Sequence, residues 1–594
     1  MTDKALILHT VSDAQHCVNN DLHKGHLLFC TNSGVEVYMK EAHSVQCRCL
    51  SSFFTNKEVF QLMDRASADV DKLLDSLDTN VSPELNARYG FKINYFRCLY
   101  SYFGKFQYMG YLILSEAVKK ISKLFTLTYI VFYDYRFNTF IDTDKPMAEI
   151  ASLLFDNVVN TKAISYPNPV EAKSGMRLQD MVKRIRRKHL YIIGKLYTQA
   201  MAELKNRVLS KNKKTILVYD NLYEVDFLIN NFGDYNVIFY KNESGVPVGF
   251  KAKEYVSGVS KDYYDFKDDI EGDIGQLFLS DLKSDFDKNI DKYLNTVLML
   301  RDIQKKYPVS LGIWGLGPTN RIRAFVFEYL RSEGITILGA QHGCLYGDSY
   351  IPWHFDAELY RCTEFISYGF TEEDLRRLYP DKTQHASIVP LGKVKLPMIK
   401  KASKVIDILF PITNSISMLE GGMCRTLPHK MTEIQIDILN YLNGIKGLSI
   451  YVKPFINSNY DNCSVIPVLN KMKNLTVVYD MILLEFLEKY HPNAIIIEYP
   501  SQPLVEVLHM DMEIFLMNCE LSPFENQALS ELIKRVYFAY DTGELISMLE
   551  QYIRGTLPKK RDTTYYNHYV YKEGTKENIG KLINRLCEGY QVAL

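Results

Sequence analysis

The sequence carries no excess of charge of either sign, because 70 Lys and Arg residues balance 70 Asp and Glu residues over 594 positions. A general nucleic-acid binder normally has a basic excess, so nucleic acid is not the expected partner. Long apolar runs are also missing, since the most apolar stretch, residues 108–133, is broken by Lys119, Lys120 and Lys123. We therefore predict neither a membrane span nor a signal peptide. The expected location is the cytoplasm, with a peripheral contact at the inner membrane left open.

The cysteine and glycine signatures of several protein classes are absent. The eleven cysteines are odd in number and scattered, and the one close pair, Cys47 and Cys49, has no second pair to complete a zinc site. No cluster of His, Asp and Glu has metal-ligand spacing, so we predict no metal site. Neither a P-loop nor a G-x-G-x-x-G fingerprint occurs, which argues against a P-loop NTPase and an ordinary NAD enzyme. We expect no cofactor.

Short apolar runs followed by longer amphipathic stretches recur along the chain. The runs are rich in β-branched and aromatic residues and lack strict alternation, which is typical of strands buried on both faces of a parallel sheet. They lie at residues 26–30, 129–133, 215–219, 236–240, 310–314, 336–340, 405–410, 448–452, 475–479 and 494–498. Helical patterns such as 321–333 lie between them. The sequence therefore predicts an α/β fold with crossover helices.

A domain boundary is expected near residue 400. Residues 390–392 (PLG) end one unit, the lysine-rich stretch 393–404 follows, and a new strand begins at Val405. Such a stretch is typical of an interdomain linker. We predict an N-terminal domain over 1–400 and a C-terminal domain over 401–594.

Two further segments have predicted roles. Residues 141–212 have a mainly helical pattern and form an expected insertion in the N-terminal domain; they include the basic run 183–189 (KRIRRKH). This run is either a solvated helix face or a contact for an anionic lipid or polysaccharide. The last helix, near residues 576–587, is expected to cross back to the first domain.

The strongest local signal is the segment 334–347, GITILGAQHGCLYG. An apolar strand leads into His342, and ligands of open α/β sheets bind beyond the carboxyl ends of the strands. Gly343 and Gly347 permit tight turns and close approach to a ligand. His342 is therefore a candidate functional residue, and the alternative is a histidine with a structural role.

This segment resembles the QHG–YG element of bacterial surface-polysaccharide glycosyltransferases, the group that includes the capsule-type β-Kdo transferases. Further segments resemble elements of the same family in the same order. They are 364–370 (EFISYGF), 389–392 (VPLG), 410–415 (FPITNS), 451–454 (YVKP) and 495–506 (IIIEYPSQPLVE). The resemblance covers residues 300–594, with a fainter echo at 26–49.

The resemblance implies two Rossmann-like domains facing across a cleft, the GT-B arrangement, with the acceptor on the N-terminal domain and the donor nucleotide on the C-terminal one. Its nucleotide-binding positions correspond to Thr413, Asn414, Ser415, Lys453, Ser501 and Glu506. Its substrate-binding positions correspond to Gln341, Gly343, Tyr346 and Asn320. Expected partners are a nucleotide-sugar donor and a glycan or glycolipid acceptor.

The residue types in the second half suit an anionic nucleotide. Ser501 falls at an N-cap position and Pro503 suits the first helical turn, so backbone N–H groups would face an anion. Lys453 could neutralise a phosphate, and the Glu506 carboxylate could accept both ribose hydroxyls. The alternatives are a surface lysine at a strand end and an acidic residue that stabilises a helix N-terminus.

The sequence departs from the family pattern at two places. Glu498 stands where the family usually has Asp, and Gln502-Pro503 replaces a Ser or Thr after Ser501. Some relatives also carry an acidic residue at the end of the strand before the QHG strand, whereas residues 314–320 (WGLGPTN) contain no carboxylate.

The catalytic candidates are therefore His342 and three carboxylates that follow other strands. These carboxylates are Asp134, Asp220 and Glu224, each of which could instead cap a helix. His342 could act as general base to an acceptor hydroxyl, or donate a hydrogen bond to the donor's phosphate or carboxylate, and we favour the second role.

We predict a metal-independent glycosyltransferase that builds a bacterial surface glycan. The resemblance favours a CMP-activated ulosonic acid over a UDP-hexose as donor. Alternatives are an alditol-phosphate transferase of the teichoic-acid type and a non-catalytic polysaccharide-assembly protein of the same fold. Fold alone would not decide among them.

Overall fold

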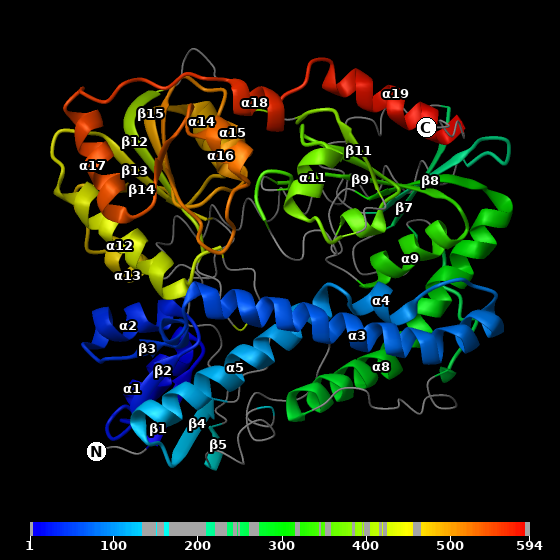
Figure 1. Cartoon of the computed structure of the whole chain (residues 1–594), viewed down its shortest axis with the longest axis horizontal. Coiled ribbons are helices and arrows are strands. Elements are labelled where there is room, and N and C mark those ends of the chain that lie inside the picture. Colours follow the sequence, from blue (N-terminus) through cyan, green and yellow to red (C-terminus); the bar gives the residue numbers. More distant parts are fainter. Residues whose placement is uncertain are drawn as a thin grey trace.

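The computed structural model describes most of the chain. The described residues are 4–133, 150, 160–164, 209–219, 234–240, 246–247, 250–259, 272–314, 321–343, 346–350, 358–382, 386–394, 396, 404–414, 419, 425–455 and 465–588. They form three parallel sheets, each covered by helices (Figure 1). The predicted α/β class with Rossmann-like sheets is confirmed.

The first sheet belongs to an N-terminal unit and has the strand order β3-β2-β1-β4-β5. Its strands are β1 (Lys4–Leu8), β2 (Leu27–Cys30), β3 (Arg48–Cys49), β4 (Tyr129–Tyr133) and β5 (Asn160–Ile164). Helices α1 (Val11–Asn19) and α2 (Ser33–His43) connect the first strands. The range 1–400 thus holds a second sheet beside the single one that we expected. The runs at 26–30 and 129–133 predicted β2 and β4 of this sheet, but its edge strands β3 and β5 are short or polar, so the pattern did not reveal a separate sheet.

The middle domain contains the second sheet, with the order β11-β10-β9-β8-β6-β7. Its strands are β6 (Thr215–Tyr219), β7 (Asn236–Tyr240), β8 (Val309–Trp314), β9 (Thr336–Ala340), β10 (Glu364–Ser367) and β11 (Ser387–Pro390). The helices α9 (Arg321–Ser332) and α11 (Glu372–Leu378) follow β8 and β10. The carboxyl ends of β9, β10 and β11 therefore lie side by side, which brings the QHG segment next to residues 367–370 and 391–393.

The C-terminal domain contains the third sheet, with the order β14-β13-β12-β15-β16-β17. Its strands are β12 (Lys404–Ile412), β13 (Ile450–Pro454), β14 (Thr476–Val477), β15 (Tyr490–Ile497), β16 (Glu513–Met517) and β17 (Tyr537–Ala539). Its helices are α12 (Pro428–Gly444), α13 (Ile466–Leu469), α14 (Leu483–Lys489), α15 (Gln502–Val507), α16 (Asn526–Leu532) and α17 (Thr542–Ile553). This is the doubly wound order in which the chain reverses between β12 and β15.

Long helices connect the N-terminal unit to the middle domain. They are α3 (Asn56–Tyr89), α4 (Tyr95–Tyr100), α5 (Phe103–Phe125) and α8 (Asp273–Lys306). In Figure 1, α3 runs from beneath the C-terminal domain to beneath the middle domain. A capping box of Thr55 and Glu58 begins α3, and its buried residues recur every three or four positions, so one face packs along its whole length.

The last part of the chain crosses back from the C-terminal domain, as predicted. Helix α18 (Thr564–Tyr569) lies between the two domains, and α19 (Thr575–Glu588) packs on the middle sheet. Ile579, Leu582 and Ile583 of α19 share a buried cluster with strands β6, β8 and β9.

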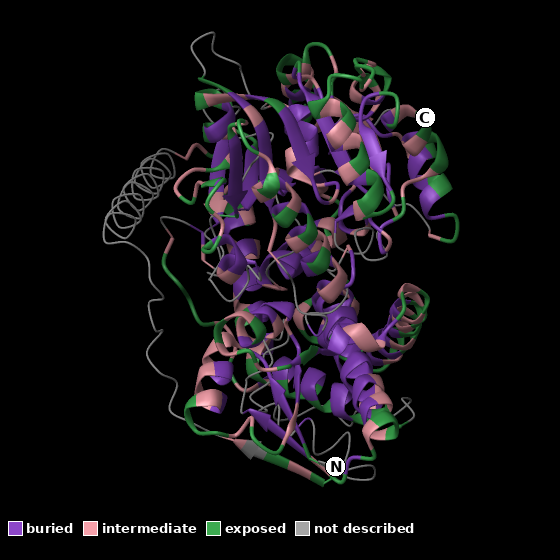
Figure 2. Cartoon of the chain, turned by 90° about the vertical axis from the view of Figure 1, so that its left-hand side faces the viewer, coloured by how far each residue is buried: buried purple, intermediate pink, exposed green. Residues whose placement is uncertain are grey.

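The N-terminal unit also contacts the C-terminal domain. Ser51 Oγ lies 2.9 Å from His429 Nδ1, at the start of α12. The Lys471 ammonium donates to the Glu41 carboxylate at 2.6 Å. These contacts join the two units, and most strands of the three sheets are buried (Figure 2).

The predicted helical insertion, residues 141–212, is described only in part. Strand β5 lies inside the range 141–212 that we predicted to be helical, because Thr161 and Ile164 continue the ladder alongside β4. The basic run 183–189 lies outside the described residues. No helix in the described part of the chain combines the length and apolar character that crossing a bilayer requires.

Candidate functional site

A cavity of about 320 Å³ opens at the carboxyl ends of β12, β13 and β15 in the C-terminal domain. This is the point where the strand order reverses, at which open α/β sheets bind their ligands. Its lining residues are Pro411, Ile412, Thr413, Lys453, Phe455, Ile482, Leu483, Leu484, Ile497, Glu498, Tyr499, Ser501, Gln502, Pro503 and Glu506. The cavity thus combines apolar walls with a few polar groups, as small-molecule sites do.

The floor of the cavity is built around Glu498, which follows β15. Its carboxyl group accepts hydrogen bonds from the backbone N–H of Thr413 and, at 2.8 Å, from Gln435 Nε2. Burial raises the pKa of Glu498 to about 8, although both of these donors work against the shift. The side chain is therefore mostly uncharged at neutral pH, and it ties the end of β12 to the end of β15.

Lys453 and Glu506 also line the cavity. Both are nearly buried, at 4% and 5% exposure. Burial raises the pKa of Glu506, while a hydrogen bond from Gln502 (3.1 Å) and the charges of Lys393 and Lys453 oppose the rise. The cavity thus offers one ammonium group and one carboxyl group to a ligand.

The mouth of the cavity is apolar. Phe455 and Ile482 both line it, and they are 51% and 50% exposed. An exposed phenyl ring beside a cavity is a stacking surface for a flat heterocycle.

Four of the six predicted nucleotide-binding residues line this one cavity: Thr413, Lys453, Ser501 and Glu506. Asn414 follows Thr413 but is not a lining residue, and Ser415 lies outside the described residues. Ser501 is the N-cap of α15, as expected, but its side chain makes no capping hydrogen bond.

The second predicted site lies at the carboxyl end of β9. The His342 ring contacts the Tyr346 hydroxyl at 2.8 Å, and that hydroxyl donates to Glu358 Oε1, also at 2.8 Å. His342 Nδ1 and Glu358 Oε1 are 3.4 Å apart. Burial works to lower the pKa of His342, but the charge and hydrogen bonding of Glu358 outweigh it and raise this pKa above 6.5. His342 therefore holds a proton more readily than a free histidine, which favours a donor role.

Gln341 and Tyr346, two of the predicted substrate-binding residues, make hydrogen bonds within the protein. Gln341 Nε2 donates to the Gly343 carbonyl at 2.7 Å, and its Oε1 accepts from the Tyr368 N–H, also at 2.7 Å. This side chain therefore clamps β9 to β10. Tyr346 is only 2% exposed and uses its hydroxyl to hold Glu358 beside His342.

The motif glycines have different roles from one another. A Cβ on Gly347 would lie 2.2 Å from Phe370 Cβ, and one on Gly369 would lie 1.8 Å from the backbone oxygen of His568. These two positions are small because other segments pack on them, which corrects our expectation of ligand approach at Gly347. A Cβ on Gly343 would meet no atom of the described residues within 4 Å.

Lys393 connects the two sites, and the sequence interpretation assigned it only to the linker. It follows β11, is 6% exposed, and donates to the Tyr368 hydroxyl at 3.2 Å. Its charge lowers the pKa of both His342 and Glu506, so one ammonium group lies within electrostatic reach of both domains. Its position directly after the predicted 389–392 element was the available signal.

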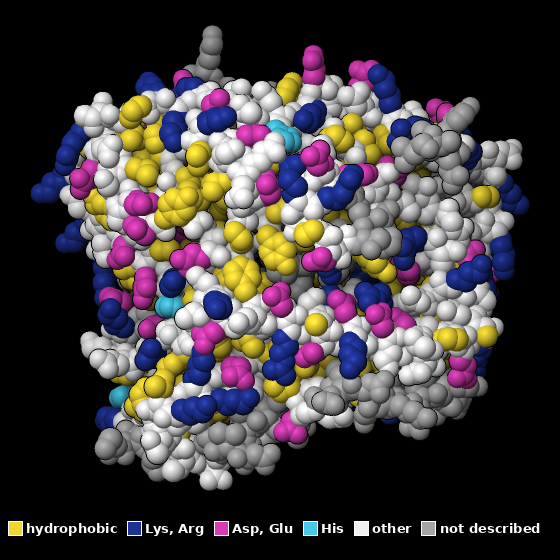
Figure 3. Space-filling view, in the orientation of Figure 1, with side chains coloured by type: hydrophobic (Ala, Val, Ile, Leu, Met, Phe, Trp, Pro, Cys, Tyr) yellow, Lys and Arg dark blue, Asp and Glu magenta, His cyan; other side chains and the backbone are white. Residues whose placement is uncertain are grey.

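The remaining candidates cannot be placed. Asp134, Asp220, Glu224 and Asn320 all lie outside the described residues, although the strands that precede them, β4, β6 and β8, are described. Across the described ranges, no three His, Cys, Asp or Glu side chains come together as a metal site. Basic and acidic side chains are interspersed over the face in Figure 3.

Comparisons with known proteins give no family. No family model and no curated protein matches the sequence. Solved structures that resemble it include UDP-GlcNAc 2-epimerase from Neisseria meningitidis bound to UDP-GlcNAc, with 14% identity, a TM-score of 0.36, and coverage of 62% of this chain and 100% of that chain. The S. aureus MnaA–UDP co-structure has 10% identity, a TM-score of 0.39, and coverage of 63% and 97%. Acinetobacter baumannii MurG has 8% identity, a TM-score of 0.35, and coverage of 63% and 99%. Identities and TM-scores this low establish neither a family nor a function.

Proposed function

We propose that this protein is a glycosyltransferase that takes a sugar from a nucleotide donor bound in the C-terminal cavity and passes it to a bacterial surface glycan. One observation carries the proposal. Thr413, Lys453, Ser501 and Glu506, chosen from sequence segments far apart in the chain, line a single cavity at the strand-order reversal. Ligands of open α/β sheets bind at such a reversal.

The cavity suits a nucleoside phosphate. Lys453 supplies a cation for a phosphate, and the carboxyl group of Glu506 can accept from the ribose hydroxyls. The exposed ring of Phe455 offers a stacking surface for the base. These assignments leave the sugar end of the donor directed toward His342 and Lys393.

The transfer itself forms one bond and breaks one. An acceptor hydroxyl oxygen bonds to the anomeric carbon, the bond from that carbon to the phosphate oxygen breaks, and the phosphate leaves with the electron pair. The hydroxyl proton passes to a base, for which Asp134, Asp220 and Glu224 are the candidates. Lys393 and protonated His342 stabilise the departing phosphate electrostatically.

The finer proposal is a CMP-activated ulosonic acid as donor and a glycan or glycolipid as acceptor, without a metal ion. The sequence resemblance supports it. The residues near the ends of β9 and β11 also support it, because an ulosonic acid carries a carboxylate beside its anomeric carbon, and the Lys393 ammonium and a protonated His342 ring are suited to hold that carboxylate.

The test is release of nucleotide from a panel of CMP-, UDP- and GDP-sugars and CDP-alditols by the wild type and by variants of His342. We expect release from a CMP-sugar. If His342 holds the donor, donor binding weakens in His342→Ala and partly recovers in His342→Asn. If it is the base, His342→Asn loses on the order of 10²–10⁴-fold in rate with donor binding intact.

Other outcomes overturn the proposal. Release from CDP-alditols alone would assign an alditol-phosphate transferase. If the protein neither releases nucleotide nor binds it, the assignment would be a non-catalytic assembly protein. The matched control is Glu550→Gln, a change on the exposed face of α17 away from the cavity, where Glu550 pairs with Arg554. This variant should match the wild type.

A further inference from the structure

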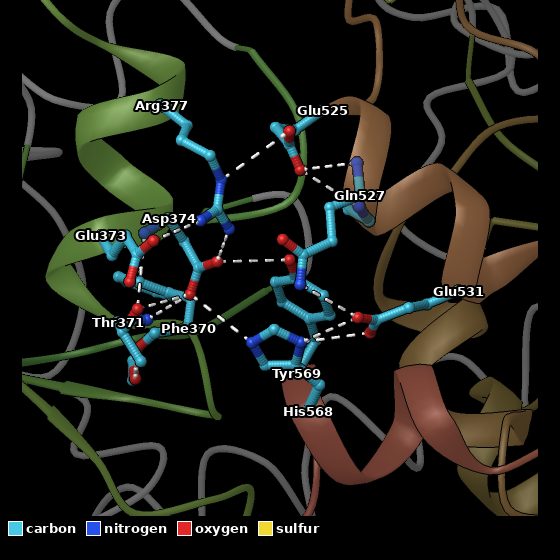
Figure 4. Close-up of polar contacts among 12 residues, drawn as sticks. Phe370, Thr371, Glu373, Asp374, Arg377, Glu525, Gln527, Glu531, His568 and Tyr569 are labelled. Atoms are coloured by element: carbon cyan, nitrogen blue, oxygen red, sulfur yellow. Dashed lines mark hydrogen bonds and ion pairs between the residues drawn. The ribbon is translucent and has the colours of Figure 1, made fainter.

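One histidine lies where three elements from different parts of the chain meet. His568 belongs to α18, the crossover helix, and its ring lies between α11 of the middle domain and α16 of the C-terminal domain (Figure 4). His568 Nδ1 is 3.1 Å from Glu531 Oε2 on α16. His568 Nε2 is 3.6 Å from Asp374 Oδ2 on α11. The imidazole therefore connects a carboxylate of one domain to a carboxylate of the other.

Two carboxylates that face the two ring nitrogens favour a ring in which both nitrogens carry protons. A carboxylate oxygen only accepts hydrogen bonds, and a neutral imidazole has one N–H donor and one acceptor nitrogen. The neutral ring can thus satisfy Asp374 or Glu531, and turns a lone pair toward the other. The imidazolium satisfies both at once.

The surrounding charges favour the protonated ring. The other titratable groups near it are Glu373 and Arg377 of α11, Glu525 before α16, Asp348, and Tyr565, Tyr569 and Lys572 of the crossover segment. Arg377 is held by Asp374 and lies 3.7 Å from Glu525, so its charge is already shared between carboxylates. The interaction with Asp374 is the largest cause of a raised His568 pKa, and Glu531 adds to it against the effect of burial.

The backbone holds His568 firmly in this position. Its carbonyl oxygen packs on Gly369, where an added Cβ would lie only 1.8 Å away. Its ring stacks on Tyr569, with 4.1 Å between ring centroids. The backbone of α18 at His568 therefore cannot move away without losing its contact with the turn that precedes α11.

Several other contacts of this interface do not titrate near neutral pH, but Asp348 does, because burial raises its pKa to about 6 and it accepts a hydrogen bond from the Tyr565 hydroxyl of α18. The Tyr350 N–H donates to the Pro523 carbonyl at 2.9 Å, and the Ser349 hydroxyl donates to the Ser522 carbonyl at 2.7 Å. These bonds join the two domains at any pH. The histidine link is a separate, proton-dependent contact beside them.

We propose that His568 is a proton-operated latch between the middle and C-terminal domains. With the ring protonated, α18 ties α11 to α16 in the arrangement of this structure; with the ring neutral, one tie is lost and the domains separate more readily. Because the pKa is raised in the latched state, the latch is fully closed below pH 6.5, the ordinary pKa of histidine, and is lost as the pH rises through the raised value. This device is independent of the proposed enzymatic activity.

The test measures the interdomain distance against pH by fluorescence energy transfer. Dyes on amino acids introduced at Arg554 and Lys581, whose side chains are 71% and 69% exposed, report on α17 of the C-terminal domain and on α19, which packs on the middle domain. The wild type should show a pH transition with a midpoint above 6.5. His568→Gln should give the alkaline value throughout, and His568→Lys, which keeps the charge, should give the acidic value throughout.

Glu531→Gln gives a second, independent measurement, because losing one carboxylate should move the midpoint to lower pH. His43→Gln, on α2 of the N-terminal unit, is the matched control and should behave as the wild type. A wild-type signal that does not change between pH 5.5 and 9, or a transition that persists unchanged in His568→Gln, would overturn the proposal.

Discussion

The clearest quantitative prediction concerns Glu498, the buried carboxyl group beneath the cavity. It is 2% exposed, and burial raises its pKa from 4.5 to about 8. The folded protein therefore keeps a proton that the unfolded chain releases, so the stability contributed by this group is complete below pH 4.5 and is lost as the pH rises through about 8. Replacing it by Gln removes the titration while keeping the shape of the side chain.

The magnitude follows from the width of this window. One extra proton held by the folded state lowers the free energy of unfolding by about 1.4 kcal/mol for each pH unit. Between about pH 5 and about pH 7.5, the wild type should lose roughly 3 kcal/mol that Glu498→Gln keeps. For a domain of this size that corresponds to a relative shift in Tm of about 6–12 °C. The Gln variant also loses a hydrogen bond, because its amide nitrogen cannot accept, but this cost is the same at every pH.

Differential scanning calorimetry at a series of pH values measures the effect. The informative quantity is the difference in Tm between Glu498→Gln and the wild type, which should grow steadily up to about pH 7.5 and level off above about 8. Glu550→Gln, at the protein surface, should show no such growth. A difference between Glu498→Gln and the wild type that stays constant across this range would refute the idea that Glu498 is buried as the neutral acid.

Two further predictions concern the packing at Gly369 and the partner of His342. Gly369→Ala places a methyl group against the His568 carbonyl and should destabilise the protein by about 1–3 kcal/mol in denaturant unfolding, whereas Gly343→Ala meets no atom of the described residues within 4 Å and should be close to neutral; equal effects would contradict the packing role. Glu358→Gln removes the charge that raises the His342 pKa, so an NMR titration should show this pKa falling below 6.5, while an unchanged value would mean that Glu358 is not its cause.

The sequence predicted much of the fold because buried parallel strands leave a recognisable pattern. Runs such as 129–133, 215–219 and 336–340 coincide with β4, β6 and β9. The edge strands of the N-terminal sheet could not be predicted, since Arg48–Cys49 is too short to show a period and Asn160–Ile164 is largely polar.

Part of the candidate site could also be proposed from the sequence, because some of its residues lie in recognisable strands and helices. Lys453 lies near the end of β13 and Glu506 lies in α15, both recognisable elements, so their chemistry could be proposed from their position in the pattern. Glu358 and Lys393 could not be assigned that way, because their roles depend on contacts with residues distant in the sequence or on neighbouring strands. Gln341 is the opposite case. It belongs to a motif that the sequence made recognisable, and its side chain holds β9 to β10.

Nucleotide binding to the C-terminal cavity tests the central claim most directly. Isothermal titration calorimetry with CMP, CDP, UDP and GDP should show binding of at least one, with a cytidine nucleotide the tightest. Lys453→Met and Glu506→Ala, which alter residues lining the cavity, should each weaken binding by about tenfold or more, a change of about 1.4 kcal/mol. Lys446→Met, at an exposed position of the same domain, should bind as the wild type does. Absence of binding by all four nucleotides, or binding that neither cavity variant weakens, would contradict the account.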